Sequence, residues 1–289
     1  MVIIAAKDAK SAMSTLIKSK WRGAAVKCAL ALTFTVVVGT SGYAQLTTVA
    51  HDGFNYSAGS LNGQNGGTGW TSSWLNDYTS GASFQVSLTG MSYSGLTTSG
   101  GSLAWASGGN GISEDSRSLP LMNSGVVFIQ FLGQFGSSSG GGTPNIRLLN
   151  SGALTGGLGG NGGPFGSKMS ILDATLNPAA NGSSSSTANL SALNLVIARI
   201  DYQNDSTSLW VNPNLSTFDY ENPTTADATY AGLAPTFNTI AIDSRSPGSV
   251  DEISVMAEPV PEPTAVTLML TGMGVAYVWR RRNKAASLT

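Results

Sequence analysis

The chain has 289 residues, of which 11% are charged and 36 are glycine, and its formal net charge is −1. The charges are segregated, because residues 45–259 hold five Lys or Arg residues against fourteen Asp or Glu residues, a net charge of −9. This acidic segment lacks the basic footprint of a nucleic-acid-binding protein, so that class is excluded. The one cysteine, Cys28, lies outside the segment, which excludes disulfide and thiolate chemistry within it.

Residues 1–44 have the pattern of a secretory signal peptide. Basic residues between positions 18 and 27 precede an apolar run at residues 28–39, and the small residues Gly42 and Ala44 occupy positions −3 and −1 of a cleavage site. The pattern predicts a signal-peptide helix, export through the Sec translocon and cleavage by signal peptidase after Ala44. Met13 would give a leader of ordinary length and is an alternative start. An uncleaved N-terminal anchor is the other interpretation.

The segment after the cleavage site combines alternating aromatic residues with a run rich in glycine and asparagine. Residues 51–56 read HDGFNY and residues 59–70 read GSLNGQNGGTGW, with Trp74 shortly after. Alternation of Phe54 with Tyr56 is typical of a strand, and the Gly/Asn run predicts turns. The pattern DGF-Y--GSLNGQNGGTGW---W resembles the opening of exported bacterial proteins with a laminin-G-like or concanavalin A-like jelly roll. The resemblance implies a fold and no particular activity.

Short β-type segments separated by glycine-rich turns follow as far as residue 257. The apolar run at 126–132 is typical of a central strand, and residues 193–202 and 207–211 predict a hairpin. Other strands are expected at 84–88, 91–93, 103–106, 145–149, 168–172, 237–243 and 250–256, whereas residues 151–166, with eight glycines, are expected to form a loop. No stretch of 45–259 has a helical period, so residues 45–257 are predicted to form an all-β, jelly-roll β-sandwich.

The C-terminal tail has three parts in a fixed order: a short Pro-Glu-Pro motif, an uncharged span at residues 264–279 and a basic stop. A 16-residue helix spans about 24 Å, which is short for a hydrocarbon core of about 30 Å. Three arginines after the span favour a cytoplasmic C-terminus. The sorting motif is Val260, Pro261, Glu262 and Pro263, and the membrane stop is Arg280, Arg281 and Arg282.

This order resembles the PEP-CTERM sorting signal of Gram-negative bacteria. The resemblance implies that residues 258–284, with a transmembrane helix at 264–279, hold the exported protein in the inner membrane, where an exosortase-type enzyme processes it. The protein would then work at the cell surface or outside the cell. An ordinary C-terminal anchor is the alternative interpretation.

Residues that could support catalysis are few. A Ser-His-Asp triad would have to use His51, the one histidine, which lies beside no Gly-x-Ser-x-Gly motif. Glycoside hydrolysis needs two carboxyl groups about 5 to 9.5 Å apart. The acidic pairs Glu114-Asp115 and Asp251-Glu252 are adjacent in sequence, so on a regular strand each pair would point to opposite faces. We therefore predict that the protein is not an enzyme and has no catalytic residues.

Two kinds of binding site remain as candidates. Asp52 on the first strand and Asp251 and Glu252 on the last would be neighbours in a jelly roll and could hold calcium, which takes six to eight oxygen ligands. The alternative is that they are solvated strand-edge charges or partners of Arg199 or Arg245. Exposed aromatic residues could contact glycans, and the candidates are Trp105, Trp210 and Tyr202. The alternative for these aromatic residues is the hydrophobic core.

Together these patterns predict an exported, non-enzymatic protein of the cell envelope or extracellular matrix, sorted through its tail and associated with exopolysaccharide. The expected partners are the Sec translocon, signal peptidase, an exosortase-type enzyme, the inner membrane and a polysaccharide. No cofactor other than calcium is expected. The alternative function is a carbohydrate-binding module or glucanase-like enzyme acting on polysaccharide.

Overall fold

The computed structural model of the chain describes residues 46–79, 83–106, 113–136, 145–160, 168–177, 186, 188–244 and 246–258. The predicted signal peptide, the sorting motif at 260–263 and the basic stop at 280–282 lie outside these residues. The described residues belong to one compact unit, and every regular element among them is a β-strand. Among them no helix has the length and apolar character needed to cross a bilayer. The all-β prediction is confirmed for this part of the chain.

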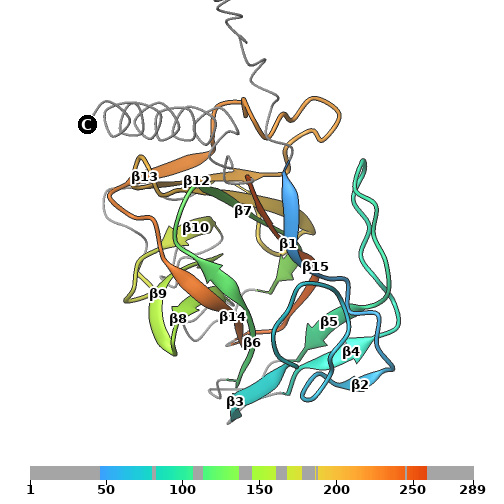
Figure 1. The fold of residues 1–289 in the computed structure, drawn as a ribbon. Helices are drawn as coiled ribbons and strands as arrows, with labels where there is room; N and C mark the ends of the chain where they lie inside the picture. The colour runs from blue at the N-terminus through green and yellow to red at the C-terminus, as the bar shows by residue number, and fades with distance from the viewer. Residues whose placement is uncertain are drawn as a thin grey trace, which may run out of the picture. The chain divides into compact units, whose positions relative to one another are not determined.

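The larger of two antiparallel sheets has nine strands, with β7 and β15 at its centre (Figure 1). In order across the sheet the strands are β13 (Ala228–Ala231), β12 (Ser206–Val211), β11 (Asn194–Asp201), β7 (Val126–Phe135), β15 (Gly248–Ala257), β5 (Ser102–Trp105), β4 (Gln85–Ser87) and β2 (Gly59–Ser60), while β1 (Thr47–Asp52) pairs with β15. The expected neighbourhood of the first and last long strands is therefore confirmed.

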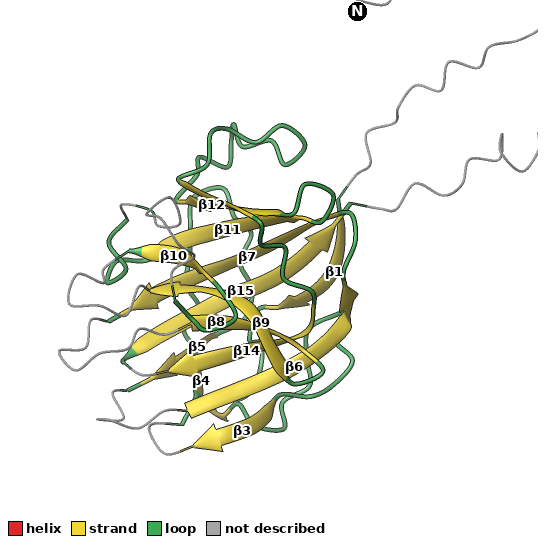
Figure 2. Ribbon diagram, turned by 90° about the vertical axis from the view of Figure 1, so that its left-hand side faces the viewer, coloured by secondary structure: helices red, strands yellow, loops and turns green. Residues whose placement is uncertain are grey.

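The smaller antiparallel sheet has six strands (Figure 2). In order they are β10 (Met169–Leu172), β9 (Ala153–Gly160), β8 (Asn145–Asn150), β14 (Phe237–Ser244), β6 (Ser113–Met122) and β3 (Leu75–Thr79). The edge strands of this sheet are β10 and β3, and its centre is the pairing of β14 with β8 and β6.

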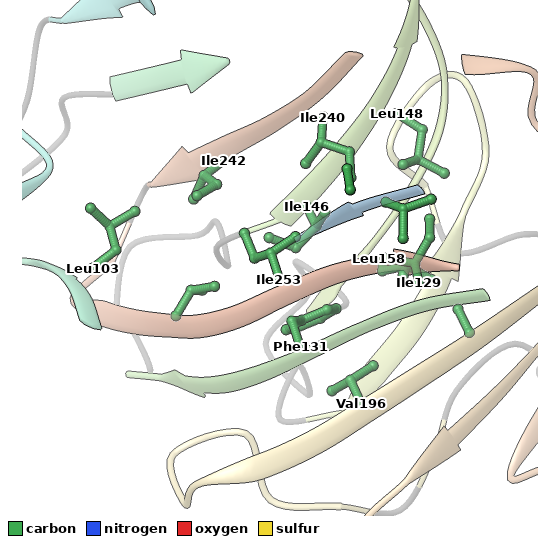
Figure 3. Packing of buried hydrophobic residues seen from close by; sticks show 14 of the residues in the cluster. Leu103, Ile129, Phe131, Ile146, Leu148, Leu158, Val196, Ile240, Ile242 and Ile253 are labelled. Atoms are coloured by element: carbon green, nitrogen blue, oxygen red, sulfur yellow. The ribbon is translucent and has the colours of Figure 1, made fainter. Parts of the chain in front are cut away.

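The main core lies between the two sheets. Along β7, Val127, Ile129 and Phe131 point inward at every second position, as the pleat of a strand requires. Figure 3 shows Ile129 and Phe131 near Ile146, Ile240 and other side chains of the six-stranded sheet. Fully burying one such side chain contributes about 1.5–3 kcal/mol. The apolar alternation of both sheets therefore holds them together as a β-sandwich.

Several sequence-based expectations about strands were wrong, including the strand expected at Phe54 and Tyr56, because β1 ends at Asp52. Residues 153–160 form β9 although the segment is rich in glycine, because β8 and β10 pair with it on both sides and override the low intrinsic preference of glycine for strands. Strand β6 was missed because its first residues are polar on both faces. Residues 91–93 form no strand, since Met91 and Tyr93 pack as a loop against the outer side of the nine-stranded sheet.

Candidate functional site

Asp52, one of the predicted calcium ligands, is fully buried between the sheets. Its carboxylate accepts hydrogen bonds from the Trp74 indole N–H at 2.8 Å, the Tyr56 hydroxyl at 2.6 Å and the backbone N–H of Phe54 at 2.9 Å. Arg117 Nη1 on β6 donates a fourth bond at 2.6 Å and makes a buried ion pair. Four donors therefore engage this carboxylate, and one of them already supplies the compensating positive charge.

Arg117 also contacts residues in and just after the glycine-rich N-terminal motif. Its Nε donates to the Ser72 carbonyl at 2.8 Å and its Nη2 to Asn65 Oδ1 at 3.0 Å. The guanidinium also lies over the rings of Trp70 and Trp74, at 5.1 and 6.0 Å from their centroids, as in a cation–π contact. The glycine-rich motif that suggested the fold therefore has a structural role. Its contacts with Arg117 help to join β1 of the nine-stranded sheet to β6 of the six-stranded sheet.

Asp251 and Glu252, the other predicted calcium ligands, are buried at a β-bulge in β15. Glu252 has a positive φ of 53°, and the bulge breaks the regular alternation. Asp251 accepts from the Met91 N–H at 2.8 Å and Glu252 from the Ser99 N–H, so both carboxylates meet the same loop. The expectation that this adjacent pair would point to opposite faces was wrong for that reason.

Ionisable groups at this bulge have shifted pKa values. Burial raises the pKa of the Asp251 carboxyl to about 7. The His51 Nε2 lies 2.7 Å from Glu252 Oε2, and this hydrogen bond, more than any other contact, raises the pKa of the His51 imidazole. A charged His51 would partner Glu252, whereas Asp251 is favoured in its neutral form.

These three acids fit a calcium ion poorly. Pairing of β1 with β15 brings them to one region, as expected. Their oxygens, however, accept from N–H and O–H donors, and no group of three or more His, Cys, Asp or Glu side chains suited to a metal occurs in the described part of the chain. The alternative of solvated charges was wrong, because all three are buried. Arg199 pairs instead with Asp201 at 2.9 Å, and Arg245 lies outside the described residues.

The three predicted glycan-contact residues do not form an exposed aromatic platform. Trp105 is 5% exposed and packs against Phe84 and Phe135, and its indole N–H donates to the Ser246 carbonyl. Trp210 is 4% exposed, and its N–H donates to the Thr224 carbonyl. The half-buried Tyr202 hydroxyl lies 2.9 and 2.8 Å from the carbonyl oxygens of Met122 and Pro235. Structural roles in and around the core, the alternative interpretation, account for all three.

The outer face of the nine-stranded sheet is covered by the chain itself. A second apolar cluster there joins Phe128, Leu132, Leu195 and Ile197 of β7 and β11 to Trp210 and Phe218. Residues 212–227 lie on this cluster, where the Tyr220 hydroxyl donates to Gln130 Oε1 at 2.6 Å. The Tyr93 hydroxyl contacts the Pro213 carbonyl at 3.3 Å and links a second loop to this cover. A filled, apolar face of this kind leaves the nine-stranded sheet without an exposed row of aromatic residues among the described side chains.

The outer face of the six-stranded sheet differs, because polar residues line up across it. One residue of each strand contributes to a cross-strand series of Cα partners, which we call the polar row: Ser170, Gly159, Asn145, Asp243, Glu114 and Tyr78. Ile146 and Ile242, the neighbours of Asn145 and Asp243, point into the core, so the row faces away from it. The row ends at Tyr78 on the edge strand β3, which is 56% exposed.

Arg147 connects the charged members of the polar row. It lies two residues after Asn145 on β8 and forms ion pairs with Glu114 and with Asp243 on the two following strands. Burial raises the pKa of the Glu114 carboxyl in spite of the nearby Arg147 charge. Around Arg147 the neighbouring positions of β9, β14 and β6 are small: Gly157, Ala241 and Ser116. The result is a charged, hydrogen-bonding strip flanked by short side chains.

The sequence identified Glu114 as part of an acidic pair, but it did not predict the polar row. As expected, Glu114 and Asp115 point to opposite faces: Asp115 accepts from Asn76 Nδ2 at 2.6 Å, and burial raises its pKa to about 6. Alternation in residues 145–149 places Asn145 and Arg147 on one side of a strand. The partners of that strand could not be read from the sequence, because β6 and β9 were not recognised.

Comparisons with known proteins give distant likenesses only. No protein-family model matches the chain, and no curated protein sequence matches it. A solved sialidase is 10% identical with a TM-score of 0.42, covering 64% of this chain and 17% of the sialidase. A GH131 beta-glucanase catalytic domain from Podospora anserina is 10% identical, with a TM-score of 0.38 over 64% of this chain and 86% of that one.

A third solved structure is the VIP36 exoplasmic/lumenal domain in its Ca2+/Man3GlcNAc-bound form. It is 12% identical with a TM-score of 0.38, covering 66% of this chain and 92% of that domain. At TM-scores of this size the likeness carries no argument about this chain. The architecture therefore rests on the strand order and the pairing of the two sheets.

Proposed function

We propose that the protein is an exported, non-enzymatic component of the cell envelope or extracellular matrix, sorted through a PEP-CTERM signal and associated with exopolysaccharide. The folded part would be a jelly-roll sandwich of the concanavalin A or laminin-G type. Export through the Sec translocon and signal peptidase would precede transient or lasting anchoring in the inner membrane. An exosortase-type enzyme would then act on the tail.

The observation that carries this proposal is the order of the three parts of the tail. A Pro-Glu-Pro motif, an uncharged span and three arginines follow one another at residues 260–263, 264–279 and 280–282. The short span alone would hold a helix weakly in a bilayer of about 30 Å. Each arginine near the bilayer centre costs about 2.5–3.5 kcal/mol on insertion scales, so the basic cluster stops translocation.

Two features of the folded part support a non-enzymatic role. The carboxylates of Asp52, Asp251 and Glu252 are each engaged by at least two hydrogen-bond donors and serve the fold. The outer face of the nine-stranded sheet is filled by the chain's own apolar side chains. On the other sheet, the edge strand β3 presents the exposed side chains of Leu75 and Tyr78, which are open to a polysaccharide.

The test of sorting uses two variants of the tail. Replacing Pro261, Glu262 and Pro263 with Ala leaves the span intact but removes the motif, so we expect full-length protein to remain in the inner membrane. Replacing Arg280, Arg281 and Arg282 with Ser removes the stop, so we expect unprocessed protein to be released. Fractionation with an antibody to the sandwich separates these cases. If the Ala variant reaches the wild-type compartment at the wild-type size, the tail is only an anchor.

The second candidate function, a glucanase-like enzyme, is favoured by one observation. Glu114 and Asp243 are direct cross-strand partners, and opposed side chains in such pairs have Cβ atoms about 4.5–5.5 Å apart, near the carboxyl separation of a retaining glycosidase. The raised pKa of Glu114 also suits a general acid. Arg147, however, forms ion pairs with both carboxylates. Release of reducing ends from soluble glucans that is lost in Glu114→Gln would establish the enzyme and overturn the non-enzymatic proposal.

Calcium dependence is a separate proposal with its own test. The sequence placed a calcium site at Asp52, Asp251 and Glu252, and their donors in the fold argue against it. We expect the melting temperature to be the same in millimolar calcium and in chelator. An increase with calcium that disappears in Glu252→Gln would restore the calcium site.

A further inference from the structure

We infer that residues 89–101, which we call the strap, hold residues 212–227, which we call the cover, over the outer face of the nine-stranded sheet, and that the two segments open together while the sandwich stays folded. The device goes beyond the proposed function, since it depends neither on sorting through the tail nor on a polysaccharide. It controls access to the apolar face that β7, β11 and β12 present there.

The strap is a loop whose two ends meet. It connects β4 to β5 (Figure 1), and the Ser102 hydroxyl donates to the Thr89 carbonyl at 2.7 Å, which closes the neck of the loop. A Cβ atom added to Gly90 would lie 2.9 Å from the Gly100 carbonyl oxygen, so glycine lets the two ends approach this closely. Compact loops of about 6–16 residues with adjacent ends form distinct units on a protein surface.

Two adjacent carboxylates of β15 attach the neck of the strap to the nine-stranded sheet. Asp251 Oδ2 accepts from the Met91 N–H at 2.8 Å near one end of the strap, and Glu252 Oε1 accepts from the Ser99 N–H near the other end. Both carboxylates are buried, and the bulge at the positive φ of Glu252 lets neighbouring side chains meet the same loop. These two hydrogen bonds act as a latch at the base of the strap.

The tip of the strap contacts the cover. The Tyr93 hydroxyl donates to the Pro213 carbonyl at 3.3 Å, and the Leu96 N–H closes a turn by donating to the Tyr93 carbonyl at 3.0 Å. In this turn a Cβ atom added to Gly95 would lie 3.2 Å from Leu215 Cβ. Tyr93, Leu96 and Leu215 all pack against the apolar cluster of the nine-stranded sheet. The strap and the cover therefore share one packed surface.

Burial separates these two segments from the strands beneath them. None of residues 88–100 is buried, and Phe218 is the one buried residue of the cover. In β7, by contrast, every residue except Gln134 is buried. Segments with few buried apolar contacts open locally with a lower free energy than core strands do. The strap and the cover can therefore leave the sheet without unfolding of β7.

Shared contacts couple the two openings. The cover is attached to the sheet by Phe218, which packs between Trp210 and Tyr220, and by the Tyr220 hydroxyl bond to Gln130. Release of the strap removes the packing of its tip from the cover, so the opening of either segment makes the opening of the other less costly. In the closed state the chain itself occupies the apolar face, and in the open state that face is accessible.

Hydrogen–deuterium exchange of the full-length protein in a mild detergent tests the coupling. Tyr93→Ala and Leu96→Ala remove packing at the tip, and exchange should become about fivefold faster or more in residues 88–101 and also in residues 212–227. Exchange in β7 and β14 should not change. The matched control is Leu88→Ala, because Leu88 lies beside the strap but is 72% exposed, and it should leave the cover unchanged.

Two further variants test the coupling from the other segment and from the latch. Leu215→Ala on the cover should make exchange in the strap faster, because a coupling between two segments is reciprocal. Asp251→Ala removes the acceptor of the Met91 N–H and should make exchange in the cover faster through the strap. Since Asp251 is buried, the variants of half-buried loop residues decide the test if Asp251→Ala does not fold.

Exposure of the apolar face gives an independent measurement. The dye ANS binds exposed apolar surface, so its fluorescence should rise in Leu96→Ala and not in Leu88→Ala, while both variants still melt cooperatively. Faster exchange in the strap with no change in the cover would show that the segments open independently and would overturn the inference. Equal acceleration in β7, or no change in either segment, would overturn it as well. These outcomes leave the sorting test of the tail variants unaffected.

Discussion

The two outer faces of the sandwich are built in opposite ways. On the nine-stranded sheet, Phe128 and Trp210 are covered by residues 212–227, and this face is apolar and self-contained. On the six-stranded sheet, acidic, basic and amide side chains line up across the strands, with Arg147 between two carboxylates. Buried atoms there, such as Asn145 Oδ1, lack partners, which is rare in folded proteins.

The difference concerns the stability that each face contributes. Apolar burial on the nine-stranded sheet contributes about 25 cal/mol for each Å² removed from water and has no need of a ligand. Unpaired buried polar atoms on the six-stranded sheet oppose folding. Removal of apolar side chains from the first face should therefore lower stability, whereas removal of an unpaired hydroxyl from the second should raise it.

The largest effect is expected at the buried ion pair between Arg117 on β6 and Asp52 on β1, which joins the two sheets. Arg117→Met leaves Asp52 buried without a compensating charge, which costs about 3–5 kcal/mol of unfolding free energy. Urea denaturation measures this loss. The control is Arg199→Met, whose partially exposed pair with Asp201 should contribute about 1 kcal/mol or less. Equal losses in the two variants would show that the Asp52 network does not join the sheets.

A large effect is also expected on the covered face. Phe218 packs edge-on against Trp210 and Tyr220, at 5.6 and 5.0 Å between ring centroids. Because it is 9% exposed, Phe218→Ala should cost about 3 kcal/mol. The exposed Tyr78→Ala on the other face should change stability by about 0.5 kcal/mol or less. Similar costs for the two variants would contradict the contrast between the faces.

A smaller effect is expected from pH, at the bulge of β15. Burial raises the pKa of Asp251 to about 7, so its favourable contribution is complete below its unfolded value of 3.8 and is lost as the pH rises through 7. The raised pKa of His51 acts in the same direction, with its contribution complete below 6.5 and lost at higher pH. The melting temperature should therefore fall between pH 5 and pH 8.

Variants at the bulge identify the source of the pH effect. Asp251→Asn removes the titrating carboxyl and should flatten the fall in melting temperature. Asp173→Asn is the control, because that exposed carboxyl has a lowered pKa from its hydrogen bond with Thr175 and titrates below this range. A melting temperature that rises with pH in the wild-type protein would contradict the assignment.

The smallest effect is a gain in stability on the polar face. Ser170→Ala removes a buried hydroxyl without a partner and should raise the free energy of unfolding by about 1 kcal/mol. The control is Ser208→Ala on the other sheet, where the exposed hydroxyl pairs with Thr229 at 3.2 Å and the change should stay within about 0.5 kcal/mol. A loss of stability in Ser170→Ala would mean that the hydroxyl has a structural partner.

Local pattern was enough to predict much of the fold. The apolar run of β7 and the hairpin of β11 and β12 were recognised, because central strands and turn residues have strong signals. In the turn of this hairpin, the carboxylate of Asp201 accepts from the backbone N–H groups of Gln203 and Asn204. Strands β6 and β9 were missed because paired neighbours, rather than their own composition, make them strands.

The candidate sites were harder to predict, because a site depends on which strands are neighbours. Asp52, Asp251 and Glu252 did come together, but their hydrogen-bond partners are distant in sequence, as in the contact of Asp251 with Met91. Trp105 and Trp210 are of the residue type that forms glycan-binding platforms, but both side chains are buried in the structure. The polar row is produced by the register of six paired strands, and that register could not be read from the sequence.

Hydrogen–deuterium exchange with a saturating soluble polysaccharide tests most directly which face binds the ligand. Binding on the six-stranded sheet predicts added protection at its exposed edge, in β3 at residues 75–79 and in the paired part of β6 at residues 113–118, with no change in residues 212–227. Protection that is confined to residues 212–227, or to β7 and β11 beneath them, would place the ligand on the nine-stranded sheet and contradict the account.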